Sequence, residues 1–245
     1  MRILLTICYD GTDFVGYQIQ PNGRSVEEVL NQAIFKTTGE RVKSIASGRT
    51  DSGVHAYAQK VHFDTNSNIP PKNFYKAINT HLPSDVKVLS SKKVADDFNA
   101  RYFAKQKTYK YSLYVSDVDN PLYSRYKTKI QTMPDIALMK ECAKVIEGEH
   151  DFKCFVASGS SVVDTVRTVY SIKIIKKSNL IDIYVTGNGF LYNMVRIIVG
   201  VLLSVGYEKM DISQVENALK TGSRPILAKT MPPQGLSLFK VNYKD

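Results

Sequence analysis

The sequence predicts an α+β fold of two tandem halves, each with the element order β-α-β-β-α-β. Three observations support this. Segments of alternating or continuous apolar residues are followed by segments with helical apolar spacing, clusters of Gly, Pro, Asn and Asp separate them, and the order occurs twice in the 245-residue chain. This order is that of the ferredoxin-like, RRM-like unit. Two such units are expected to form a continuous, mostly antiparallel sheet with a central active-site cleft.

The first half is expected to span residues 1–104. Its strands are predicted at residues 3–9, 42–46, 56–63 and 86–94 from their apolar content. One helix begins after Ser25, because Ser25 and Glu28 have the spacing of a capping box, and Gly39 ends it. A second helix follows the Pro70-Pro71 pair.

The second half is expected to span residues 105–245. Residues 108–115 alternate Tyr and apolar residues with polar ones, which is typical of a half-buried strand. A helix begins at Asp135, and a hairpin is predicted from strands at 166–176 and 180–186. Residues 190–205 predict a strongly apolar helix, followed by a short helix at 213–219 and a final strand at 236–243.

Composition indicates a cytoplasmic protein that attracts polyanions. The formal net charge is +10, and such a surplus favours nucleic acid as a partner, although charge that serves solubility alone is the alternative. No segment of about 18 apolar residues spans a membrane, and no signal peptide is recognisable. Cys8, Cys142 and Cys154 are too widely spaced for a disulfide framework or a zinc cluster. No metal-ligand spacing and no phosphate-binding P-loop is present.

The most informative segment is GRTDSGVHA at residues 48–56. Two glycines flank Arg49 and Asp51 and allow an unusual backbone path between two predicted strands. The guanidinium of Arg49 would keep the Asp51 carboxylate ionised, and an ionised carboxylate is a possible nucleophile. Taken alone, the spacing favours an ordinary turn in which Asp51 caps backbone amides.

Four further segments turn this pattern into a family resemblance. In chain order they are YDGTDFVGYQIQ at 9–20, DFNAR at 97–101 followed by YKY at 109–111, GFLYNMVR at 189–196 with Gly200, and GLSL at 235–238. Together with residues 48–56 they resemble the motifs of the tRNA pseudouridine synthase A (TruA) family. The resemblance covers nearly the whole chain, and five motifs in register are far more specific than a lone GRTD.

The resemblance implies an isomerase that converts uridine to pseudouridine at positions 38, 39 and 40 of the tRNA anticodon arm. The base leaves the ribose at N1, turns, and rejoins through C5, so no cofactor and no metal is expected. Asp51 matches the essential aspartate of the family. Members are homodimers that bind one tRNA across both subunits. The first half would then carry the catalytic loop, and the second half would complete the active site and the dimer interface.

Four residues are expected around the target uridine. Arg49 matches the arginine that fills the place of the flipped base, with a plain surface arginine as the alternative. Tyr109 matches the tyrosine that packs on the uracil, with a core aromatic as the alternative. Arg196 lies in an apolar segment and needs a partner, for which Asp51 is expected. Leu236 would supply an apolar wall, although a lone leucine is usually core.

Further RNA contacts are expected in the long first loop and in a basic stretch before the central strand. A solvated strand edge is the alternative for the basic stretch, and His55, His62 and His81 are interpreted as structural or RNA-contacting. The candidate RNA-binding residues are Gln18, Gln20, Arg24, Arg101, Lys105, Lys107 and Lys110.

Two other functions remain open. Met231 stands where relatives carry alanine, and Ser52 where many carry alanine, so a paralogue that modifies other RNA positions is one alternative. A non-catalytic RRM-like RNA-binding protein is the other. The basic-Gly-aromatic RNP1 pattern is absent, and an RNA binder has no use for a carboxylate beside phosphates, which weighs against this second alternative.

Overall fold

The computed structural model describes residues 1–157, 162–222 and 229–243. The chain forms two compact units. Unit 1 comprises Met1–Lys105 with Ser237–Asp245, and unit 2 comprises Gln106–Leu236. The change of unit after Lys105 falls next to the expected boundary, but the C-terminal segment packs with unit 1.

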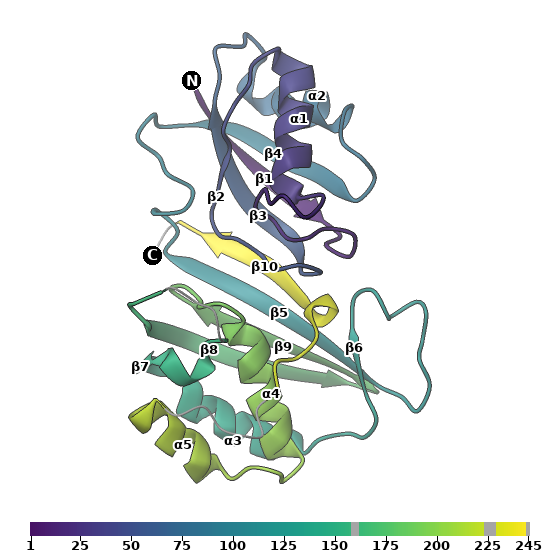
Figure 1. Ribbon diagram of the computed structural model, residues 1–245, viewed down its shortest axis with the longest axis vertical. Coiled ribbons are helices and arrows are strands. Elements are labelled where there is room, and N and C mark those ends of the chain that lie inside the picture. Colours follow the sequence, from purple (N-terminus) through teal and green to yellow (C-terminus); the bar gives the residue numbers. More distant parts are fainter. Residues whose placement is uncertain (158–161, 223–228, 244–245) are drawn as a thin grey trace. The chain divides into compact units, whose positions relative to one another are not determined.

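The sheet of unit 1 has the strand order β4-β1-β3-β10, with the short β2 paired to β3 (Figure 1). Strand β1 is antiparallel to both β3 and β4. Strand β10 joins β3 in parallel, with Ser237 opposite His55. The strands are β1 (Arg2–Tyr9), β2 (Ile45–Ala46), β3 (His55–Asp64), β4 (Val86–Val94) and β10 (Leu236–Asn242).

Helices α1 (Val26–Thr38) and α2 (Phe74–Asn79) lie together on one face of this sheet (Figure 1). The Ser25 hydroxyl accepts the Glu28 amide at the start of α1. Gly39 ends the helix with φ 76°, a left-handed conformation that favours glycine. The predicted ends of α1 are therefore confirmed.

The sheet of unit 2 has the order β5-β9-β8-β7, and β6 pairs in parallel with β5. The pairs β5–β9, β9–β8 and β8–β7 are all antiparallel. The strands are β5 (Gln106–Val115), β6 (Thr128–Ile130), β7 (Gly148–Asp151), β8 (Val166–Lys177) and β9 (Leu180–Gly187).

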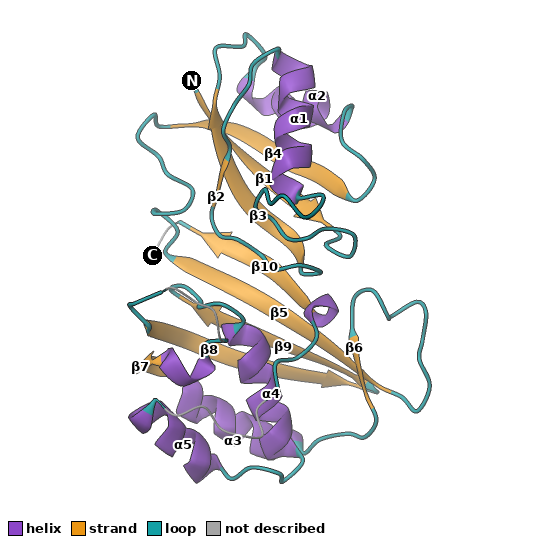
Figure 2. Cartoon of the chain, in the orientation of Figure 1, coloured by secondary structure: helices purple, strands orange, loops and turns teal. Residues whose placement is uncertain are grey.

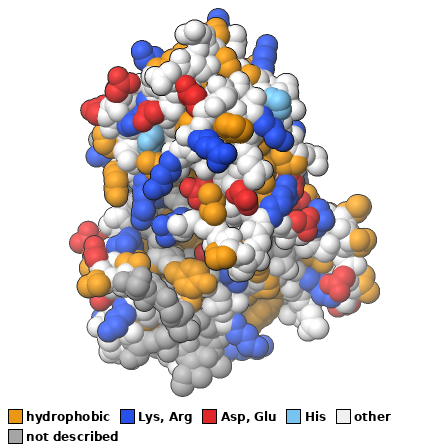
Figure 3. All heavy atoms as spheres, turned by 45° about the horizontal axis from the view of Figure 1, so that its top comes forward, with side chains coloured by type: hydrophobic (Ala, Val, Ile, Leu, Met, Phe, Trp, Pro, Cys, Tyr) orange, Lys and Arg blue, Asp and Glu red, His pale blue; other side chains and the backbone are white. Residues whose placement is uncertain are grey.

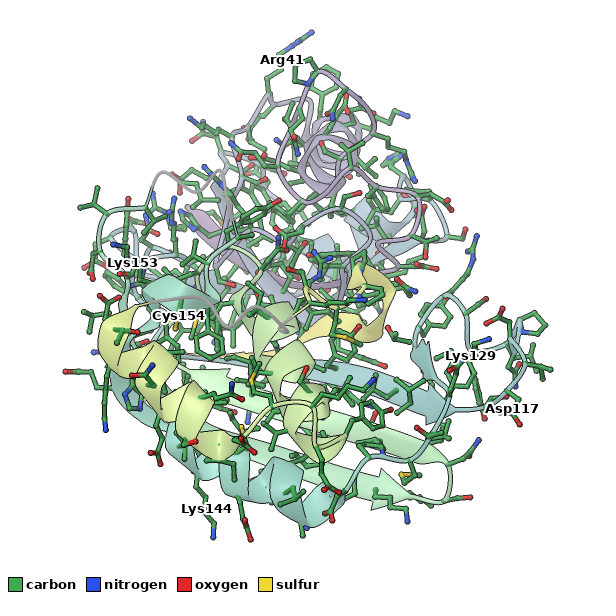
Figure 4. All side chains as sticks on the ribbon, turned by 60° about the horizontal axis from the view of Figure 1, so that its bottom comes forward. Arg41, Asp117, Lys129, Lys144, Lys153 and Cys154 are labelled. Atoms are coloured by element: carbon green, nitrogen blue, oxygen red, sulfur yellow. The ribbon has the colours of Figure 1, made fainter. Side chains whose placement is uncertain are left out.

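Three helices accompany this second sheet, and α3 contacts both of the others (Figure 2). The 3-10 helix η2 carries Cys154 and contacts α5 (Figure 4). The helices of unit 2 are α3 (Ile136–Ile146), α4 (Met194–Gly206), α5 (Ile212–Thr221), η2 (Phe152–Phe155) and η3 (Pro233–Gly235). No helix in the described ranges is long and apolar enough to cross a bilayer.

The predicted α+β class with mostly antiparallel strands in two halves is confirmed. Two helix predictions were wrong in extent. Helix α4 begins at Met194 instead of residue 190, because Asn193 adopts a left-handed φ of 59° directly before it. The helix after Pro70 starts as the 3-10 turn η1 (Pro71–Asn73) and α2 ends at Asn79, which leaves His81 outside it.

Candidate active site

The loop that carries Asp51 connects β2 to β3 and is fixed at its base by Gln59. The Ser47 hydroxyl donates to Gln59 Oε1 over 2.5 Å, and Gln59 Nε2 donates to the Gly48 carbonyl over 2.7 Å. Both Ser47 and Gln59 are fully buried. Because buried polar groups are costly unless they are hydrogen-bonded, this pair favours one path for the loop.

The long first loop, residues 10–24, holds the same segment from the other side. The Tyr17 amide donates to the Thr50 carbonyl over 3.0 Å, and Gly16 forms an isolated antiparallel bridge with Asp51. The Ser52 hydroxyl donates to the Phe14 carbonyl over 3.1 Å. Backbone contacts thus position Asp51, and its side chain is half-buried.

Gly11 shows how closely the two loops approach. A Cβ at this position would lie 2.0 Å from the Val54 carbonyl oxygen, so only glycine fits. The Gly11 amide also donates to Nδ1 of the buried His55 over 2.9 Å. The same Nδ1 lies 3.2 Å from Asp10 Oδ1.

The buried hydroxyl of Tyr9 completes this clamp from the neighbouring strand β1. It is 2.8 Å from Thr50 Oγ1, and Thr50 itself is 6% exposed. Arg49, one residue earlier, is exposed. The loop therefore turns Thr50 inward and Arg49 outward on either side of a fixed backbone, with Asp51 next in the chain. Such a segment can present a carboxylate and a cation to a bound ligand.

The three candidate RNA-binding residues of the first loop differ in their exposure and in their hydrogen bonds within the protein. Gln18 is exposed, and Gln20 donates to the Val15 carbonyl over 3.3 Å. Arg24 forms two bonds to Asp85, at 2.6 and 3.0 Å, and its guanidinium stacks 4.2 Å from the centre of the Phe14 ring. The hydrogen bond to Asp85 raises the pKa of Arg24. Arg24 therefore also has a structural role.

In unit 2, Tyr109 lies on β5 opposite Val185 and is 8% exposed. Its ring meets Phe190 edge-on, with ring centres 5.3 Å apart. Most of the Tyr109 side chain is thus packed as a core aromatic would be.

Arg196 occupies the first turn of the apolar helix α4. Its Nε donates to the Met231 carbonyl and its Nη1 to Asn193 Oδ1, each over 2.6 Å. These two acceptors explain how a guanidinium is tolerated in an apolar helix. The Met231 amide donates back to the Arg196 carbonyl over 3.3 Å. The helix and the segment before β10 are therefore joined at Arg196.

Tyr111 is a supporting residue that the sequence did not single out. It is fully buried, its hydroxyl donates to the Pro232 carbonyl over 2.7 Å, and it lies 2.7 Å from Thr128 Oγ1. A Cβ on Gly235 would come within 2.6 Å of the Tyr111 ring. Burial raises the pKa of Tyr111 well above its ordinary value. Tyr111 thereby fixes the approach to Leu236, which is 5% exposed. The alternation of Tyr111 with Tyr109 along the predicted strand was the sequence signal that could have identified Tyr111.

The basic stretch does not form a track on one face. Lys107 and Lys110 are three residues apart on β5, so their side chains point to opposite faces of the strand. Lys110 Nζ pairs with Asp182 over 2.9 Å. Arg101 and Lys105 are exposed before the strand, with the Arg101 guanidinium 5.9 Å from the centre of the Tyr102 ring.

Comparison with known proteins decides the family. A family model described as tRNA pseudouridine synthase matches residues 6–103 and 142–244. The chain belongs to this family. A tRNA pseudouridine synthase A of Thermoanaerobacter sp. (strain X514) is 45% identical over 242 residues, covering 99% of each chain. A tRNA pseudouridine synthase A 2 of Clostridium perfringens is 44% identical over 242 residues, again covering 99% of each chain.

Membership confirms the resemblance drawn from the five motifs and the assignment of the chain as a pseudouridine synthase. The first matched range contains the Asp51 loop, and the second contains Arg196 and Leu236. Tyr109 lies between the two ranges. Its position in the chain is covered instead by the full-length relatives.

Proposed function

We propose that this chain converts uridine to pseudouridine at positions 38, 39 and 40 of the tRNA anticodon arm, with Asp51 as the nucleophile. One observation supports this most strongly. Asp51 is held on a loop whose backbone is bonded on both sides, to the Tyr17 amide through Thr50 and to Gln59 through Gly48. Positioning a reacting group in advance removes part of the entropic barrier of the reaction.

The reaction balances without any added group. The bond between N1 and C1′ breaks, a bond between C5 and C1′ forms, C5 loses a proton and N1 gains one. An ionised carboxylate can form a covalent intermediate and so divide this rearrangement into two easier steps. The chain therefore needs no cofactor and no metal for the reaction.

The remaining site residues are proposed to act on a flipped base. Taking the uridine out of its stack costs a few kcal/mol, and the exposed Arg49 would take its place among the neighbouring bases. Tyr109 would pack on the uracil, Leu236 would exclude water beside it, and Arg196 would keep the Asp51 carboxylate ionised. The first loop and the basic stretch would contact the tRNA backbone through Gln18, Gln20, Arg24, Arg101, Lys105, Lys107 and Lys110.

A homodimer that works in the cytoplasm is part of this proposal. Unit 1 would supply the catalytic loop, and unit 2 would complete the active site and contribute the dimer contacts. The alternative of a paralogue with other target positions drew on Met231. In the structure Met231 meets Arg196 through its backbone carbonyl and amide. A side-chain difference there leaves both bonds in place, so the anticodon arm remains the preferred substrate.

The test is chemical mapping of pseudouridine after incubation of the protein with an unmodified tRNA transcript. We expect product at positions 38, 39 and 40 wherever the transcript has uridine there. A matched transcript with cytidine at these positions is the control and should give none. Product at other positions alone would favour the paralogue. Tight binding without product would favour the RNA-binding alternative.

A further inference from the structure

One face of the unit 1 sheet is left uncovered by helices. On β1 the side chains of Ile3, Leu5 and Ile7 are fully buried, whereas among the alternate residues Leu4 is 4% exposed and Thr6 and Cys8 are half-buried. Successive side chains of a strand point to opposite faces. Thr6 and Cys8 therefore belong to the face that the two helices do not cover.

The strand register places three lysines on this uncovered face. Thr6 lies opposite Lys60 on β3 and opposite Ser90 on β4. Leu4 lies opposite Lys92, and Cys8 lies opposite Lys87. We call Lys60, Lys87 and Lys92 with Thr6 and Ser90 the lysine face.

Donors converge at the centre of the lysine face. Lys60 Nζ donates to Thr6 Oγ1 over 2.7 Å, and the Ser90 hydroxyl donates to the same oxygen over 3.0 Å. Thr6 Oγ1 therefore accepts twice, which leaves its own proton for an outside acceptor. Ser90 and Lys92 are exposed, so an acceptor can reach this cluster from solvent.

The lysine face carries uncompensated positive charge. Across the described residues, none of Lys60, Lys87 and Lys92 forms an ion pair. The acid on this face, Asp64, is bound twice by Arg2, over 2.7 and 2.8 Å. Burial and then the charge of Lys92 lower the pKa of Lys60. An anion placed here would relieve the repulsion between the two lysines.

Aromatic side chains accompany the lysines. Tyr57 on β3 is 53% exposed and Phe239 on β10 is 38% exposed. Their ring centres are 5.7 Å apart, in an edge-to-face arrangement. Tyr57 precedes Lys60 by three residues on β3, and β3 carries one extra residue between them, because Ile7 pairs with Gln59 and Tyr9 pairs with Ala56. This bulge offsets the usual alternation, so Tyr57 lies on the same face as Lys60, about 10 Å away along the strand. Large aromatics that remain this exposed are characteristic of a binding surface.

We propose that the lysine face, together with Tyr57 and Phe239, binds the sugar–phosphate backbone of RNA and stacks one of its bases. Lysines that meet phosphates beside exposed aromatics are the combination found where proteins hold single-stranded nucleic acid. A protein partner would need a more continuous apolar surface than this one. The site is distinct from the Asp51 loop and does not require the reaction proposed for it.

The composition of the lysine face distinguishes it from the rest of the positively charged surface. The surface drawn in Figure 3 carries Lys and Arg side chains at several separate places, next to acidic and hydrophobic ones. A net charge of +10 would produce such a distribution without any built site. The lysine face differs because Lys60 and Ser90 both donate to one hydroxyl oxygen, Thr6 Oγ1, and because two exposed rings lie beside it.

The test is binding of unmodified tRNA by the full chain, measured by fluorescence anisotropy at several salt concentrations. The double variant K60Q/K92Q should bind about tenfold more weakly and should lower the slope of log affinity against log salt by about 1.4 to 1.8. The matched control is K140Q/K144Q, which removes the same charge from exposed positions of α3 (Figure 4). The control should keep the affinity and slope of the wild type.

A second variant separates stacking from charge. Tyr57→Leu keeps an apolar side chain but removes the ring, and it should weaken tRNA binding about fivefold or more without changing the salt slope. The proposal is wrong if K60Q/K92Q binds tRNA like K140Q/K144Q. It is also wrong if K60Q/K92Q changes the oligomeric state of the protein and leaves RNA binding unchanged. Asp51→Asn should leave this binding intact, so failure of the catalytic proposal would be seen separately.

Discussion

The two units hold their candidate catalytic groups by different means. In unit 1, Asp51 is placed by backbone contacts between two loops, and Gly11 and Gly16 make their close approach possible. In unit 2, Arg196 is held by side-chain bonds to Met231 and Asn193. The position of Asp51 therefore depends on the backbone path of its loop, whereas Arg196 is positioned by the hydrogen bonds of its own guanidinium.

The largest expected effect comes from adding one carbon at Gly11. Gly11→Ala would drive a Cβ to 2.0 Å from the Val54 carbonyl, and overpacking of this kind costs about 3 kcal/mol in the free energy of unfolding. Gly39→Ala is the control, because nothing lies within 4 Å of its Cβ and only its φ of 76° opposes the change, at about 1 kcal/mol. Denaturant unfolding measures both. Equal losses would show that the two loops can separate at little cost.

A smaller loss of stability is expected when the buried tyrosine hydroxyl of either unit is removed, Tyr9 in unit 1 or Tyr111 in unit 2. Tyr111→Phe removes the bond to the Pro232 carbonyl and the contact with Thr128, so we expect a loss of about 2 kcal/mol. Tyr9→Phe removes the contact with Thr50, and about 1 kcal/mol should be lost.

The same two variants should also differ in their steady-state kinetic parameters. Tyr9→Phe loosens the Asp51 loop and should lower kcat, whereas Tyr111→Phe loosens the segment that leads to Leu236 and should raise KM for tRNA. Steady-state rates on an unmodified transcript measure both parameters. The reverse assignment would contradict the division of roles between the units.

The smallest effect concerns the buried thiols of unit 2. Burial raises the pKa of Cys142 to about 12 and that of Cys154 to about 11, from an ordinary value of about 9. The neutral thiols therefore stabilise the fold fully below pH 9, and this contribution is lost as the pH rises from about 9 toward those values. The loss between pH 8.5 and 10 should be smaller in Cys142→Ala than in the wild type. An identical pH dependence would mean that the thiol is not buried.

The elements that were predicted correctly are those with local sequence signals. The ends of α1 were predicted by Ser25 and Gly39, and both cap the helix as expected. The short strands β6 and β7 were missed because three or four residues carry no periodicity of their own. The late start of α4 was missed because the apolar pattern continues through Asn193, and only its backbone angle shows the break.

The site residues that belong to one motif could be predicted from the sequence. Contacts between segments that are far apart in the sequence could not. Asp51 and Arg49 stand in one recognisable segment, but the hydrogen bond from Gln59 to Gly48 depends on how the loop folds back on β3. The contact of Tyr111 with Pro232 joins residues 121 positions apart. Neither contact has a spacing that a single sequence reveals.

The central claim is that Asp51 carries the reaction. The most direct measurement is the single-turnover rate of pseudouridine formation by Asp51→Asn on an unmodified tRNA transcript, with Ser52→Ala as the neighbouring control. We expect Asp51→Asn to fold and bind tRNA like the wild type but to lose activity on the order of 10³-fold or more, while Ser52→Ala remains within about tenfold. An Asp51→Asn variant that forms pseudouridine at the wild-type rate would contradict this claim.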